Sequence, residues 1–123
     1  MVSDDGVLDL MLAHPASLGG PGGETTNPEQ LFAAGYAACF HSALKRVAGS
    51  DKLDVEGSTM TAHVGLGVDG KVFGLVVTLA GYFPALDAAV GKELMDKAHQ
   101  VCPYSRATRG NIEVTLTVAD APA

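Results

Sequence analysis

The chain has 123 residues, of which 47% are hydrophobic, and its formal net charge is −6. These values are typical of one globular domain that is long enough to form a core and small enough to gain stability as a dimer. The acidic balance leaves no basic surface to neutralise phosphates, so we expect neither nucleic acid nor an anionic membrane as a partner. A small neutral substrate fits this composition better.

The N-terminal segment lacks the features of a signal peptide, because residues 1–6 carry acids where such a peptide is positively charged. The longest apolar run, residues 31–40, is too short to cross a bilayer. We therefore expect a cytoplasmic protein. In that reducing compartment Cys39 and Cys102 are not expected to form a permanent structural disulfide, so each is a buried hydrophobe, a metal ligand or a redox-active thiol.

The first third of the chain predicts a strand, a loop and the start of a helix. Residues 6–12 alternate weakly between apolar and acidic side chains, which predicts a strand, and the glycine-rich stretch 19–23 predicts a loop. Asn27 is a favourable N-cap, Pro28 suits the first helical position, and the Glu29 carboxylate complements the helix dipole. A helix is therefore expected to begin at residue 28.

This first helix is expected to continue to about Val47, with Gly49 as its stop signal. Between residues 31 and 40 its side chains are apolar nearly all round. A helix that is apolar on every face is typically buried, so we expect burial of this one.

The middle of the chain predicts a hairpin followed by a second helix. Residues 55–68 and 71–83 are rich in β-branched and small side chains, and the Val-Asp-Gly-Lys sequence at their junction predicts a tight turn between antiparallel strands. A second helix is expected from an Asp87 cap to about Val101, because its apolar residues repeat at helical spacing. Pro103 is expected to end it.

The last predicted element is a strand. Residues 112–118 alternate between apolar and polar side chains, the pattern of a strand with one solvated face. Strands and helices in this order, joined mostly by local hairpin pairing, indicate an α+β fold rather than a doubly wound one. We expect residues 1–123 to form a single domain.

The two cysteines occupy positions that suit a redox pair. Cys39 lies within the first helix among small residues, and Cys102 lies at the end of the second, where a side chain can move between buried and exposed positions. A thiol peroxidase needs two cysteines that can meet, because the second thiol captures the sulfenic acid formed on the first. The alternative, that Cys39 is simply a small buried hydrophobe, remains open from its position alone.

Only the thiolate is a strong nucleophile, and a cysteine in mid-helix needs a nearby side chain to favour that form. Glu29 lies ten residues before Cys39, which is about 15 Å along a continuous helix, so the two cannot touch within one straight helix. Glu29 can serve the thiol only if it comes from a second copy packed antiparallel across a two-fold axis, or if the helix is broken. Otherwise it is an acid that favours the first helical turn.

A zinc site is another interpretation, because Cys39 with His41 and His99 with Cys102 supply a possible tetrahedral ligand set. Residues two positions apart on a helix point about 200° apart, however. Cys39 and His41 are therefore not expected to converge on one ion.

Several segments carry a resemblance to a known family. They are residues 27–32 (NPEQLF), 35–39 (GYAAC), 101–105 (VCPYS) and 108–111 (TRGN). These segments resemble the Ohr branch of the OsmC/Ohr family, and the match runs over about residues 5–118. The resemblance implies an intertwined homodimer in which antiparallel sheets flank two central helices, with both active sites at the subunit interface.

The resemblance also implies an activity that needs no cofactor. The Cys39 thiolate would attack an organic hydroperoxide, release an alcohol and become a sulfenic acid, with which Cys102 would condense to a disulfide. A lipoylated protein, or a small dithiol such as dihydrolipoamide, would then reduce that disulfide. These steps would defend the cell against oxidative stress.

In one respect the chain departs from the family pattern. The family has an arginine near the N-terminus, held by the glutamate that matches Glu29, which ionises the attacking thiol; this chain has no arginine there. Three explanations compete: the chain is shortened at its N-terminus, one of Arg46, Arg106 and Arg109 takes the arginine's place, or the protein is a catalytically impaired dimer that binds a ligand or a partner. Arg109 belongs to the shared motif, where a structural role suits it.

Overall fold

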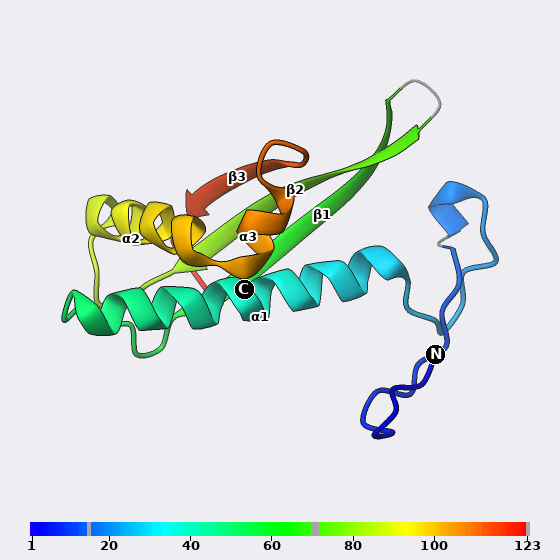
Figure 1. The fold of residues 1–123 in the computed structure, drawn as a ribbon, viewed down its shortest axis with the longest axis horizontal. Helices are drawn as coiled ribbons and strands as arrows, with labels where there is room; N and C mark the ends of the chain where they lie inside the picture. Colours follow the sequence, from blue (N-terminus) through cyan, green and yellow to red (C-terminus); the bar gives the residue numbers. More distant parts are fainter. Residues whose placement is uncertain (15, 70–71, 123) are drawn as a thin grey trace.

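The computed structural model describes residues 1–14, 16–69 and 72–122. Its elements in chain order are the short helix η1 (Ala16–Leu18), α1 (Pro28–Ser50), β1 (Thr59–Asp69), β2 (Val72–Tyr82), α2 (Ala88–Val101), α3 (Pro103–Thr108) and β3 (Glu113–Val118). The predicted α+β class is confirmed. The α-helices pack together beside a sheet, while the residues before α1 extend away from this body (Figure 1). Within the described ranges, no helix combines the length and the apolar character needed to cross a membrane.

The sheet has the strand order β1-β2-β3 and is mixed. β1 and β2 form the predicted antiparallel pair, although residues 70 and 71 of the predicted turn lie outside the described residues. β3 pairs with β2 in parallel, so the sheet is not wholly antiparallel as the family resemblance implied. The physical reason is that the chain crosses back through α2 and α3 before β3, and such a crossover returns a strand in the same direction.

The core lies between the sheet and the helices. On β2, Val77 and Leu79 are buried, and they lie opposite Val114 and Leu116 of β3. The residues between these positions on β3 are exposed, which confirms the predicted alternation of that strand. One face of the sheet therefore carries the apolar side chains on which the helices pack.

α1 begins as predicted and ends later than predicted. The Asn27 side chain accepts a hydrogen bond from the backbone N–H of Gln30. Gly49 does not stop the helix, which runs to Ser50. Its end is set two residues further on, where Lys52 adopts a positive φ of 56° and the N–H of Leu53 returns to the carbonyl of Ala48 at 2.9 Å. This closure lets Leu53 pack on the core, which decides where the helix stops.

The prediction that α1 is buried on every face is wrong for a single chain. Its buried residues recur every fourth position, at Tyr36, Phe40, Leu44 and Ala48, whereas Ala34 and Ala38 are exposed. The sheet and the other helices cover only one side of α1. The apolar composition of the opposite side therefore does not come from packing within this chain.

α2 starts at the predicted cap, because the Asp87 carboxylate accepts a hydrogen bond from the N–H of Val90 at 2.9 Å. It ends at Val101, as predicted. Pro103 was expected only to end α2, but it opens a further helix, α3. The first position of a helix needs no N–H, so proline can start a helix as readily as it ends one.

The strand predicted over residues 6–12 is absent from the structure. Only isolated bridges occur there, between Val2 and Asp9 and between Leu12 and Thr26. A strand is stabilised by a ladder of hydrogen bonds to a neighbour, and no strand lies beside this segment among the described residues. Several of its apolar side chains are exposed; Val7, for example, is 80% exposed.

Gly81 of β2 supports a testable prediction about core packing. A Cβ at this position would lie 2.7 Å from the Phe83 ring and 2.8 Å from the Met95 sulfur. Gly81→Ala is therefore expected to lower the free energy of unfolding by about 1–3 kcal/mol, because side chains of the core must move. Gly74→Ala on the same strand is the control, since nothing lies within 4 Å of its new methyl. Equal urea midpoints for the two variants would contradict this packing.

Candidate functional site: two thiols between three helices

The structure brings Cys39 and Cys102 together. Cys39 is half-buried on α1, and Cys102 is buried between the end of α2 and the start of α3. The Cys102 thiol donates a hydrogen bond to the Cys39 sulfur, and the two Sγ atoms are 3.6 Å apart without a bond between them. A disulfide requires the sulfurs to approach to about 2 Å, so a small rearrangement would join them.

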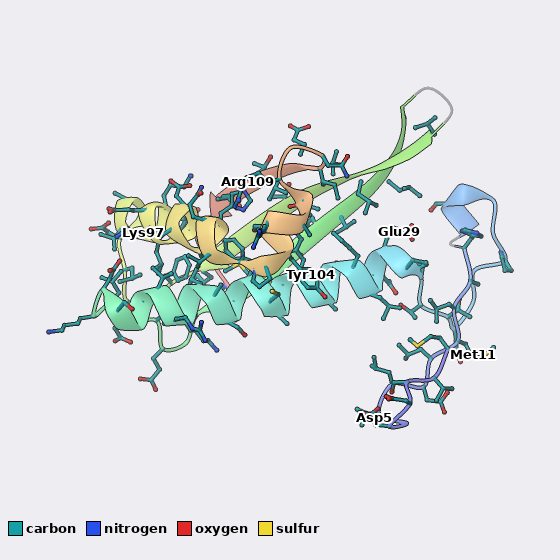
Figure 2. All side chains as sticks on the ribbon, viewed as in Figure 1. Asp5, Met11, Glu29, Lys97, Tyr104 and Arg109 are labelled. Atoms are coloured by element: carbon teal, nitrogen blue, oxygen red, sulfur yellow. The ribbon has the colours of Figure 1, made fainter. Side chains whose placement is uncertain are left out.

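Small residues on α1 let α3 approach closely at this point. A Cβ on Gly35 would lie 3.2 Å from the Tyr104 hydroxyl oxygen, which is tighter than ordinary contact. The Tyr104 ring packs against the rings of Tyr36 and Phe32, with centroids 5.8 Å and 6.4 Å away. Figure 2 shows Tyr104 over the middle of α1, and the backbone of Tyr104 forms a hydrogen bond with Cys39. The glycine thus fixes how near α3, and with it Cys102, lies to α1.

A buried hydrogen-bonded cluster beside the thiols was not predicted from the sequence. The Tyr36 hydroxyl contacts Ser105 Oγ at 2.8 Å and Thr108 Oγ1 at 3.2 Å, and Ser105 Oγ contacts His99 Nδ1 at 2.7 Å. Tyr36 and Ser105 are 69 positions apart in the sequence, so no local pattern connects them. The only sequence signal was the position of Tyr36 four residues before the apolar Phe40, which puts both on one helix face.

The Cys39 thiol is held mainly in its neutral form within this chain. Burial raises the pKa of Cys39 above its ordinary value, a backbone hydrogen bond at Tyr104 opposes the rise, and the neighbouring Cys102 thiol adds to it. Desolvation disfavours the charged thiolate, and a cation is the usual remedy. Among the described residues, no positively charged group contributes to this pKa.

Of the arginines considered as substitutes, Arg109 is held by a contact away from the thiols. The Arg109 guanidinium donates a hydrogen bond to the carbonyl oxygen of His99 at 2.8 Å. That carbonyl is in the last turn of α2, where carbonyl groups lack helical partners and a positive charge is favourable. Arg46 and Arg106 are exposed. This geometry supports a structural role for Arg109.

Glu29 lies in the first turn of α1, at the N-terminal end of the helix (Figure 2), and Cys39 lies ten residues further along it. α1 is continuous, so the possibility that a break in the helix carries Glu29 to Cys39 is ruled out. Its side chain borders a groove of about 570 Å³ between α1 and β1, which Gln30, Ala62 and Val64 also line. Its Oε2 atom is buried and has no hydrogen-bond partner among the described residues.

The residues considered for zinc do not converge. The His41 Nε2 lies 2.9 Å from the Oγ of Ser58, the residue just before β1, and His99 points its Nδ1 at Ser105. Within the described part of the chain, no group of three or more histidine, cysteine or acidic side chains is arranged to hold a metal ion. The geometry therefore does not support the zinc interpretation.

Comparisons with known proteins show the family to which this chain is similar. A family model described as OsmC-like protein matches residues 20–117. The chain is 57% identical over 119 residues to the organic hydroperoxide resistance protein of Xanthomonas axonopodis pv. citri (strain 306), covering 96% of this chain and 84% of that protein. It is 48% identical to the organic hydroperoxide resistance protein OhrA of Bacillus subtilis (strain 168), covering 98% and 86%. Among solved structures, an organic hydroperoxide resistance protein from Elizabethkingia anophelis superposes with a TM-score of 0.90 at 50% identity, covering 98% of this chain and 86% of that one.

Proposed function

Because this chain belongs to the OsmC-like protein family, we propose that it protects against organic hydroperoxides as a thiol-dependent peroxidase. Its similarity to proteins named for organic hydroperoxide resistance supports this substrate class. The observation that carries the proposal is the approach of two free thiols to 3.6 Å across helices that are far apart in the sequence.

The reaction proceeds in two steps. The Cys39 thiolate attacks the terminal oxygen of the hydroperoxide, the O–O bond breaks, and the alkoxide takes a proton and leaves as an alcohol. The Cys39 sulfenic acid then condenses with the Cys102 thiol, which forms a disulfide and releases water. An external dithiol, either dihydrolipoamide or a lipoylated protein, restores both thiols and becomes a disulfide itself.

We propose further that the active unit is a homodimer and that Glu29 acts in it. The exposed apolar side of α1 and the N-terminal residues, which form only isolated bridges, are surfaces that a second copy would cover. The buried, unpartnered Oε2 of Glu29 needs a donor that this chain does not supply among its described residues. A cationic donor, placed between Glu29 of one copy and Cys39 of the other, would stabilise the thiolate.

The proposal is tested by a titration with cumene hydroperoxide. One equivalent per chain is expected to consume both thiols, release one cumyl alcohol and yield a peptide pair joined through Cys39 and Cys102. Dihydrolipoamide should then support repeated turnover. Loss of one thiol only, or a disulfide between chains through Cys102, would contradict the two-step scheme.

A second candidate function rests on the raised pKa of Cys39. A neutral thiol reacts slowly, so the same fold would then act as a dimer that binds an apolar ligand or a partner protein without chemistry. A reaction with cumene hydroperoxide no faster than that of free cysteine at the same pH would favour this candidate.

A further inference from the structure

Four side chains from three helices form one hydrogen-bonded group next to the thiols, which we call the hydroxyl network. It consists of Tyr36 on α1, His99 on α2, and Ser105 and Thr108 on α3. Tyr36 and Ser105 have no exposed surface, and Thr108 is 3% exposed. A buried hydroxyl group without a hydrogen-bond partner destabilises the folded state. Because each hydroxyl of the network has a partner on another residue, the network constrains how the three helices pack.

In each hydrogen bond of the network, the donor and the acceptor can be assigned. The Thr108 hydroxyl donates to the carbonyl of Ser105 at 3.1 Å, so its oxygen must accept from Tyr36. Each hydroxyl has a single hydrogen, so Tyr36 in turn accepts from Ser105, and Ser105 accepts from Nδ1 of His99. If Thr108 donated to Tyr36 instead, its single hydrogen would no longer be available for the Ser105 carbonyl, and that bond would be lost. His99 therefore carries its hydrogen on Nδ1.

Members of the network lie on both sides of Cys102 in the sequence, and another member lies one helical turn from Cys39. His99 precedes Cys102 by three residues and Ser105 follows it by three. Tyr36 precedes Cys39 by three residues, one turn along the same face of α1. Both flanks of Cys102 are thus tied to the helical turn next to Cys39.

We propose that the hydroxyl network is a positioning device that holds Cys102 against Cys39 and so determines how readily their disulfide forms. The inference rests on the proposed function, in which that disulfide is an intermediate. The sulfurs are 3.6 Å apart and must meet in a restricted geometry. A segment already fixed in place loses less conformational freedom when they join, so the network favours ring closure over reaction of Cys39 with a second hydroperoxide.

The test is the equilibrium of the full chain with glutathione, in which the protein dithiol and oxidised glutathione form the protein disulfide and two reduced glutathiones. The fraction of disulfide at a series of glutathione ratios gives the effective concentration of one thiol at the other. Tyr36→Phe and Ser105→Ala are expected to lower this concentration about tenfold, which corresponds to about 1.4 kcal/mol and lies within the range for a lost buried hydrogen bond.

Two control variants separate positioning from general stability. Ser58→Ala removes a histidine–hydroxyl bond of the same type, at 2.9 Å to His41, on the β1 side of α1. Val77→Ala truncates a buried side chain on β2 and destabilises the core without altering the network. Both controls should retain the effective concentration of the unaltered chain. An unchanged or higher value in Tyr36→Phe and Ser105→Ala, or an equal fall in Val77→Ala, would overturn the proposal.

A second measurement follows the chain after a single addition of cumene hydroperoxide in excess. Tyr36→Phe should form the Cys39 sulfenic acid at the rate of the unaltered chain but should accumulate more sulfinic acid, because Cys102 captures the sulfenic acid more slowly. The glutathione equilibrium needs no hydroperoxide. If it responds as expected while no hydroperoxide is consumed, the positioning role stands and the peroxidase proposal fails.

Discussion

Cys39→Ser is expected to abolish turnover of cumene hydroperoxide with dihydrolipoamide as reductant, lowering the rate by at least about 10³-fold. A serine hydroxyl is hardly ionised near neutral pH and attacks a peroxide oxygen far less readily than a thiolate does. The substitution replaces one small half-buried group with another, so folding should be retained. Turnover is measured as loss of hydroperoxide and gain of alcohol over time.

Cys102→Ser is the informative comparison for this variant. It keeps Cys39, so the first alcohol should still be released, one per chain, but no intramolecular disulfide can follow. Mass spectrometry should then find Cys39 with one added oxygen, and with two after further hydroperoxide. Sustained turnover by Cys39→Ser would show that the attacking group lies elsewhere and would end the proposed mechanism.

The second-order rate constant of Cys39 with cumene hydroperoxide is expected to rise about tenfold per pH unit, through and beyond the ordinary pKa of a thiol. Burial raises the pKa of Cys39, so the reactive thiolate is the minor form at neutral pH and its fraction grows with each unit of pH up to that pKa. Stopped-flow measurement in the Cys102→Ser variant isolates this step, and N-acetylcysteine gives the rate profile of an unperturbed thiol.

The position of the plateau decides between the two candidate functions. If no cation offsets the cost of burying the thiolate, as in the second candidate function, the plateau should lie at higher pH than that of N-acetylcysteine. A rate that is already constant near neutral pH would instead indicate that a positive charge from a second copy, or from another arrangement of the chain, reaches Cys39, as the proposed peroxidase requires.

Elements with local signals could be predicted from the sequence. Asn27 and Asp87 mark the starts of α1 and α2 because a cap acts through its own neighbouring N–H groups. The alternation of residues 112–118 predicts β3 for the same reason, since its period is a property of consecutive residues. The end of α1 could not be predicted in this way, because it depends on where Leu53 reaches the core.

For the candidate site too, features that depend on neighbouring residues could be predicted from the sequence, and contacts between distant residues could not. The sequence by itself determined the helices that carry Cys39 and Cys102, the family to which the chain belongs, and the fact that Glu29 cannot reach Cys39 along one helix. Only the tertiary structure decided that the sulfurs lie 3.6 Å apart and that Tyr36, Ser105 and His99 bond beside them. The bonds between Cys39 and Cys102 and between Tyr36 and Ser105 join residues more than sixty positions apart, and helix packing, not local propensity, selects them.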